Sequence, residues 1–174
     1  MKLYLVQHGE AKSEAQDPQR SLSERGEEEV TNVAREVKRL DLHPSRIFHS
    51  GKLRAMQTAE ILADSLKRPA EEAQGLNPND DVRVWADRIS TEKEDLMIVG
   101  HLPFLEKLAS LLITGNENVR PVFFRYSGIV CNYFFLGSAF LGSPLTSMLI
   151  AFITYLISTF EPTFRSPMIF VSLS

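Results

Sequence analysis

A short apolar run near the start of the chain ends abruptly at a histidine and a glycine. Residues 3–10 read LYLVQHGE, with His8 and Gly9 at the end of the run. The run is too short for a helix and has the β-favouring composition of a buried strand. We therefore predict a first strand whose end presents His8 to solvent, and a Gly9 that leaves room for a ligand or another backbone to approach.

Short apolar runs of this kind alternate along the chain with stretches in which apolar residues recur at helical spacing. Residues 96–101, LMIVGH, are again apolar up to a closing histidine. Such alternation indicates an α/β domain with a largely parallel, buried sheet, which we predict to be a three-layer α/β/α sandwich. The prediction places strands at residues 3–10, 46–50, 96–101, 122–124 and 128–131, helices at 23–40, 52–66, 81–89 and 102–112, and a connection or short strand at 69–74.

Length, charge and cysteine content limit the function classes. A chain of 174 residues suits one domain with a proper core. The formal net charge of -3 argues against a general nucleic-acid binder, which is usually basic. The single cysteine, Cys131, forms no internal disulfide, and the N-terminus shows no signal-peptide pattern. We therefore expect a cytoplasmic protein.

The candidate chemistry lies at the predicted strand ends. In an open parallel sheet, ligands bind beyond the carboxyl ends of the strands, where His8, Ser50 and His101 fall. Arg54 lies on the helix that follows Ser50, and the free amides at the start of that helix can bind an anion. A neutral imidazole can attack phosphorus, while a guanidinium and a second, protonated histidine hold the phosphoryl oxygens. This set can transfer a phosphoryl group without a metal or cofactor.

Each of these residues also has a plainer interpretation. A histidine that closes a strand can be a satisfied polar group, and Arg54 can be a solvated charge. A metal site is not expected, because His8, His49, His101 and Cys131 lack close ligand spacings such as HxxxH or CxxC. Spacing alone leaves the phosphate site and the plainer interpretation both open.

Four ordered blocks resemble a known family. They are LVQHGEA at residues 5–11, RSLSERG at 20–26, HSGKLRAMQTA at 49–59 and VGHLP at 99–103. They resemble the histidine phosphatase superfamily, which also contains the phosphoglycerate mutases, and within it the small SixA-type phosphohistidine phosphatases. The resemblance covers residues 1–131, includes the segments at 75–78 and 125–129, and implies a phosphoglycerate mutase-like fold.

The resemblance also implies roles for single residues. His8 would be the phosphorylated nucleophile, Arg54 a phosphate ligand and His101 the second histidine of the phosphate pocket. Arg20 would face the same pocket. We add Gln7, Gly9 and Ser50 as phosphate-binding candidates. Gln7 departs from the family, which has an arginine at this position, so we expect slower or narrower activity.

The region that carries a general acid in many members of this superfamily is short here. Its acids match no acid motif: Glu71, Glu72, Asp80 and Asp81. Because the nitrogen of phosphohistidine leaves more readily than an alkoxide, we expect a phosphoramidate rather than a sugar phosphate as substrate. By resemblance, the substrate would be a histidine-phosphorylated signalling protein such as a phosphotransfer domain. The alternatives are a small-molecule phosphomonoesterase and a weakly catalytic module that binds phosphorylated proteins.

The last 43 residues differ from the rest of the chain, since Glu161 and Arg165 are their only charged residues. Residues 145–160 are apolar and uncharged, but a membrane-spanning helix needs about 20 residues. We predict a domain at residues 1–131 and an atypical apolar segment at 132–174. Three interpretations of that segment stay open. It could be a membrane anchor, which we do not favour, a packed or oligomerising segment that replaces or completes the last strands, or a frameshifted tail.

Overall fold

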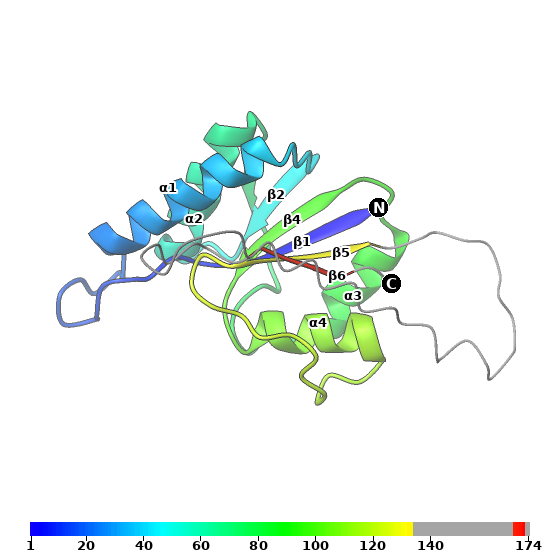
Figure 1. Cartoon of the computed structure of the whole chain (residues 1–174). Coiled ribbons are helices and arrows are strands. Elements are labelled where there is room, and N and C mark those ends of the chain that lie inside the picture. Colours follow the sequence, from blue (N-terminus) through cyan, green and yellow to red (C-terminus); the bar gives the residue numbers. More distant parts are fainter. Residues whose placement is uncertain (134–168, 173–174) are drawn as a thin grey trace, which may run out of the picture.

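The structure of the protein is a computed structural model that describes residues 1–133 and 169–172. These residues form a sheet with helices on both faces (Figure 1). The strands are β1 (Lys2–Gln7), β2 (Arg46–His49), β3 (Ala70–Glu72), β4 (Leu96–Gly100), β5 (Ile129–Tyr133) and β6 (Ile169–Ser172). The helices are α1 (Glu24–Arg39), α2 (Leu53–Leu66), α3 (Val82–Thr91) and α4 (Phe104–Thr114).

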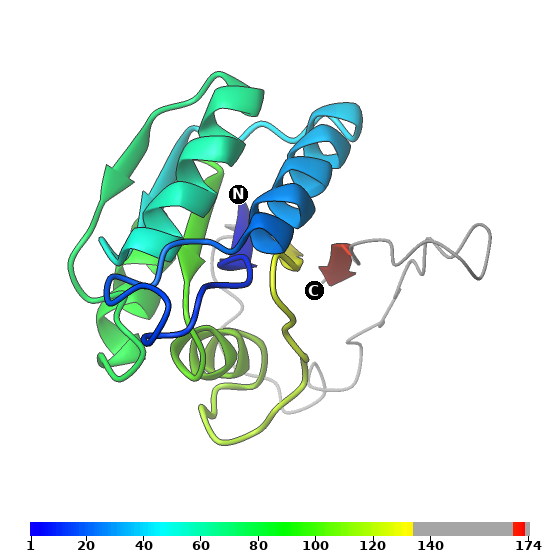
Figure 2. The ribbon, with the colours of Figure 1, turned by 90° about the vertical axis from the view of Figure 1, so that its left-hand side faces the viewer.

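The sheet is mostly parallel, as predicted. Its strand order is β3-β2-β4-β1-β5-β6, and the only antiparallel pair within it joins β1 to β5. Because β2, β4 and β1 are parallel neighbours, their carboxyl ends meet at one edge. Pairing extends one residue past β1, where the His8 N–H donates to the Gly100 carbonyl at 3.2 Å. Figure 2 turns this edge toward the viewer, with the loop between β1 and α1 in front.

Two apolar clusters fill the space on either side of the sheet. Helices α1 and α2 cover one face, where Val37 and Leu62 pack with Val6 of β1. Helices α3 and α4 cover the other face, where Trp85 and Leu105 are completely or almost completely buried. Along β1, β2, β4 and β5, alternate residues face opposite clusters, as the two-residue period of a strand requires. The predicted three-layer α/β/α sandwich is confirmed.

Helix α1 begins where the sequence predicts. The Ser23 side chain accepts the N–H of Gly26 at 3.0 Å, which caps the first turn. Glu24 and Glu27 in that turn are favoured by the helix dipole. Helix α1 is therefore fixed directly after the loop that leaves His8.

The predicted strand at residues 122–124 is wrong. The chain there has neither helix nor strand, although the side chains of Val122 and Phe124 pack against the cluster beneath α3 and α4. Both sides of β5 are already paired, with β1 and with β6, so that no position beside β5 is left for a strand from this segment. The apolar spacing reflects packing rather than strand pairing.

The last strands extend past residue 131. Strand β5 continues to Tyr133, and β6 pairs with it in parallel, from Ile129↔Ile169 to Asn132↔Ser172. The uncharged stretch at 145–160 lies outside the described residues. The structure therefore does not choose between the anchor, the packed segment and the frameshifted tail. Within residues 1–133 and 169–172, no helix is long and apolar enough to cross a membrane.

Candidate active site

Three adjacent strands end in the polar residues predicted for the site. Ser50 follows β2, His101 follows β4 and His8 follows β1. The ring centroids of His8 and His101 lie 4.8 Å apart, and Ser50 Oγ lies 2.6 Å from His101 Nε2. The topology thus gathers residues from three distant parts of the sequence at one edge of the sheet.

Helix α2 brings Arg54 to the same edge. Arg54 lies in the first turn, and its Nε donates to His8 Nε2 at 3.1 Å. The residue before the helix, Lys52, gives no side-chain cap. The first turn of α2 therefore places an arginine beside His8 at a helix start that no side chain caps, and such a start is suited to an anion.

The hydrogen bonds of His8 define which ring nitrogen is free to react. Nδ1 lies 2.7 Å from the Gly9 carbonyl, which only accepts, so Nδ1 carries the proton. Nε2 keeps its lone pair and accepts the Arg54 hydrogen bond. Burial lowers the pKa of His8 to about 4; the bond to Gly9 opposes this shift, and nearby positive charge adds to it. His8 is therefore a neutral imidazole whose Nε2 faces the cationic side of the site.

The His101 side chain is almost completely buried, and this burial sets its protonation state. Burial, followed by the charges of His8 and of neighbouring basic groups, lowers its pKa to about 3. Its Nδ1 is buried without a hydrogen-bond partner among the described residues. The expected protonated second histidine is thus neutral in the ligand-free site, since only a bound anion would supply the negative charge that raises its pKa.

The charged residues that act on the two histidines are all basic. Arg54 and Arg20 lower the pKa of both histidines, and Lys52 lowers that of His101. Burial, followed by the charge of Arg20, also lowers the pKa of Arg54. Arg20 is exposed and has a left-handed backbone, with φ of 54°. The site therefore concentrates positive charge in a chain whose net charge is -3.

The acids for which the sequence offers no motif are occupied elsewhere. Asp80 accepts the Asn77 N–H at 2.8 Å in a turn, and Asp81 caps α3. Glu71 and Glu72 are exposed, and the charge of Glu72 acts on His49. No carboxylate is among the groups that shift the pKa of His8 or His101 within the described part of the chain.

Gln7 and Gly9 flank His8, Gln7 as the last residue of β1 and Gly9 in the loop that follows. The Gln7 side chain is buried, and its Oε1 has no hydrogen-bond partner within residues 1–133 and 169–172. A Cβ on Gly9 would lie 2.7 Å from the side chain of Val30 and 3.0 Å from the Gly26 carbonyl. The close approach that we expected at Gly9 is thus made by α1, and its N–H is engaged by Thr58.

Two residues near the site were given no role by the sequence. Thr58 bonds to the backbone of both Gly9 and Arg54, and its spacing of four from Arg54, which places both on one helix face, was the available signal. The ring centroid of Tyr126 lies 5.6 Å from that of His8. Tyr126 comes from the irregular segment before β5; the family resemblance includes residues 125–129 but gives Tyr126 no role.

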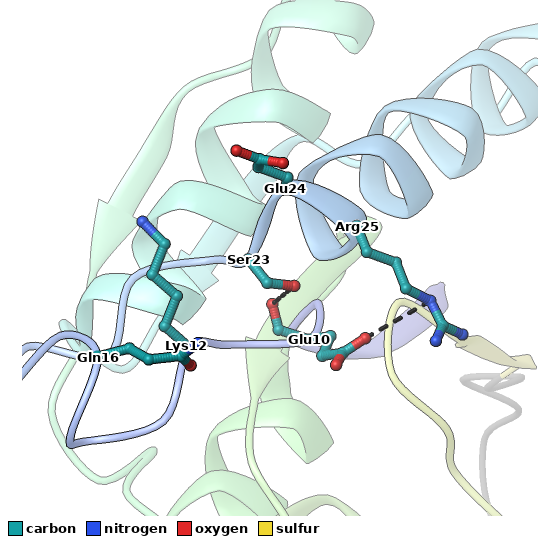
Figure 3. Close-up of a pocket in the computed structure, with 6 residues that line it drawn as sticks. All are labelled: Glu10, Lys12, Gln16, Ser23, Glu24 and Arg25. Carbon is teal, nitrogen blue, oxygen red and sulfur yellow. Dashed lines mark hydrogen bonds and ion pairs between the residues drawn. The ribbon is translucent and has the colours of Figure 1, made fainter.

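A separate polar hollow of about 470 Å³ lies beside the loop after β1 (Figure 3). Glu10 is central to it: its carbonyl accepts from Ser23 Oγ at 3.3 Å, and its carboxylate lies 3.6 Å from Arg25 Nε. Its lining residues are Glu10, Lys12, Gln16, Ser23, Glu24 and Arg25. None of the predicted site residues lines it.

The described residues offer no cluster of three or more His, Cys, Asp or Glu side chains that could hold a metal ion. His49 is buried, and its Nδ1 accepts the Gly51 N–H at 3.1 Å. This histidine therefore holds the turn after β2.

Comparisons with known proteins bear on the family and the fold of the chain. Residues 3–80 match the model of the histidine phosphatase superfamily (branch 1). An uncharacterized protein of Picosynechococcus sp. strain PCC 7002 is 36% identical over 124 residues, covering 67% of this chain and 75% of that protein. The protein histidine phosphatase SixA, solved with tungstate, is 28% identical with a TM-score of 0.66, over 74% of this chain and 85% of that one.

A second solved structure has the same fold. The putative phosphohistidine phosphatase SixA from Agrobacterium tumefaciens is 24% identical, with a TM-score of 0.65 over 75% of this chain and 88% of that one. The phosphoglycerate mutase-like fold predicted from the sequence is thus confirmed. The family match and the structural neighbours together support a phosphatase.

Proposed function

The chain belongs to the histidine phosphatase superfamily, and from this premise we propose that it removes phosphate from phosphohistidine on a protein. The observation that carries the proposal is the state of His8. Its Nδ1 is held by Gly9, its Nε2 is unprotonated, and Arg54 lies 3.1 Å from Nε2. A nucleophile and a phosphate clamp are therefore already side by side.

In the proposed first step, His8 Nε2 attacks the phosphorus and a new N–P bond forms as the substrate's N–P bond breaks. The substrate imidazole is already protonated on its other nitrogen, so it leaves as a neutral ring and takes no proton from the enzyme. Arg54 and Arg20 hold the phosphoryl oxygens, together with Ser50 and His101. In the second step, water attacks phosphorus, the His8 N–P bond breaks, and inorganic phosphate and a proton are released.

The absence of carboxylates from the charges acting on the site favours this substrate class over phosphate esters. An alkoxide leaving group needs a proton in the transition state, whereas a protonated imidazole ring does not. Within the described residues, the groups that act electrostatically on His101 are His8, which is the proposed nucleophile, and basic side chains, which would stabilise the phosphoryl oxygens.

A second candidate is a weakly catalytic module that binds phosphorylated proteins. The observation behind it is Gln7, an uncharged side chain whose Oε1 is buried without a partner among the described residues. A glutamine amide can donate one hydrogen bond to phosphate but supplies no charge. Such a module would keep its affinity for phosphorylated proteins but would hydrolyse phosphohistidine slowly.

Trapping the covalent intermediate separates these candidates. The full chain is mixed with phosphohistidine labelled on phosphorus, denatured within one turnover, and assayed for label on the protein. Wild type should retain label and His8→Ala none, while His43→Ala, changed at an exposed histidine outside the site, should match wild type. Binding without turnover or label would favour the module, and faster turnover of phosphate esters would favour a phosphomonoesterase.

A further inference from the structure

The segment between α4 and β5 leads from α4 to the candidate active site. Residues 115–128 contain neither helix nor strand and return from the end of α4 to the edge of the sheet where β1 ends (Figures 1 and 2). At that edge the Ser127 N–H donates to the Gln7 carbonyl at 3.1 Å, and the Tyr126 ring lies beside His8. The segment therefore ends as one wall of the site.

Phe123 is presented to solvent by two anchored neighbours. Val122 and Phe124 pack against the cluster beneath α3 and α4, whereas Phe123 between them is 76% exposed. It is the most exposed large hydrophobic residue described, and Val119 and Tyr126 of the same segment are also exposed. Large aromatic side chains held outward in this way are typical of anchor residues at protein interfaces.

The charge of this segment is positive. Arg120 and Arg125 are exposed and have no ion-pair partner within residues 1–133 and 169–172. The one acid of the segment, Glu117, lies 3.7 Å from Arg83 of α3. An aromatic anchor between two arginines, next to a cationic phosphate site, fits an acidic and partly apolar protein surface.

We propose that Phe123, Arg120 and Arg125 form a docking surface for the protein that carries the phosphohistidine, contacting an acidic, partly apolar patch beside its modified histidine. The inference rests on the proposed function and makes the substrate a folded protein rather than a free metabolite. In this proposal a ligand the size of free phosphohistidine contacts only Tyr126 and the residues of the candidate active site. Phe123, three residues earlier and directed to solvent, contributes only when the substrate has a surface of its own.

The test compares two substrates with the full chain: a histidine-phosphotransfer domain phosphorylated with phosphoramidate, and free phosphohistidine. Phe123→Ser should lower kcat/KM for the domain by about tenfold and leave kcat/KM for free phosphohistidine within about twofold. Arg125→Ala should lower kcat/KM for the domain and weaken its salt dependence. Val84→Ser, which removes a 62% exposed apolar side chain on α3, should change neither value.

The possible failures are distinguishable. Equal losses on both substrates, or no loss on the domain, would overturn the docking surface while wild-type turnover of free phosphohistidine still supports the proposed function. An absence of effect is also the result expected if another part of this chain or a membrane covers Phe123. Wild type that cleaves neither phosphoramidate would remove the proposed function and the docking surface together.

Discussion

Thr58 Oγ1 accepts the backbone N–H of Gly9 at 3.1 Å, across 49 residues of sequence. The same hydroxyl donates to the Arg54 carbonyl at 2.7 Å, and the side chain is completely buried. One hydroxyl therefore fixes the loop that leaves His8 against the helix turn that carries Arg54. The 3.1 Å contact between Arg54 Nε and His8 Nε2 depends on this alignment.

Replacing Thr58 by valine should lower kcat about tenfold with little change in KM, because small misplacements of catalytic groups are costly. The substitution also leaves the buried Gly9 N–H without a partner, which should cost about 1–3 kcal/mol of the free energy of unfolding. Thr58→Ser keeps the hydroxyl and should restore kcat. Steady-state kinetics with denaturant titration measure both effects, and a serine variant as slow as valine would contradict the positioning role.

The ionisation of His8 should be visible by NMR. Because burial lowers its pKa to about 4, His8 should remain neutral from pH 7 down to about pH 5, and the loss of nucleophile should occur near pH 4 rather than 6.5. Arg54→Gln removes a positive charge that disfavours the protonated ring, so the pKa of His8 should rise in this variant. Titration of the ¹⁵N-labelled imidazoles measures the shift and reports whether Nδ1 carries the proton. A pKa near 6.5 in wild type would contradict the buried neutral nucleophile.

Gly26 should tolerate no side chain. A Cβ at this position would collide with the backbone carbonyl of Glu10, and the Ser23 N–H and Oγ both donate to that carbonyl. Gly26→Ala should therefore destabilise the protein by about 3 kcal/mol or more, since backbone rather than a flexible side chain must move. Gly115→Ala is the matched control: its backbone is left-handed, but a Cβ there meets nothing within 4 Å, so the loss should be about 1 kcal/mol. If thermal or denaturant unfolding shows the same loss of stability for both variants, the loop that contains Glu10 moves aside easily and the prediction is wrong.

The fold was predictable because its signals are local. Apolar runs that end in polar residues and amphipathic helices with a cap, such as Ser23 before α1, depend on neighbours in sequence. The placement of His8 and His101 at one edge followed from the parallel topology alone. The strand predicted at 122–124 failed because pairing depends on which strand edge remains open, and β6 occupies the outer edge of β5.

The details of the site depend on contacts that spacing does not report. Tyr126 reaches His8 from 118 residues away. The neutral state of His101 follows from its depth of burial and from the surrounding basic groups, neither of which is written in the VGHLP block. The sequence does show that Gln7, and not an arginine, precedes His8, but it does not show how this glutamine changes phosphate binding or turnover.

Gln7→Arg should increase phosphate binding and turnover but lower the stability of the ligand-free protein. An arginine there adds a charge near Arg54 and Arg20. Burial, followed by repulsion from Arg20, already lowers the pKa of Arg54. The ligand-free variant should therefore unfold at lower temperature, whereas tungstate, as a phosphate mimic, should bind more tightly and kcat/KM should rise about tenfold or more.

Gln7→Leu is the control variant for this prediction. It removes the buried, unpartnered Oε1, so its stability should equal or exceed that of wild type while turnover falls. Thermal shift with and without tungstate, combined with kinetics, separates charge from packing. If Gln7→Arg binds tungstate no better and turns over no faster, position 7 does not limit the site.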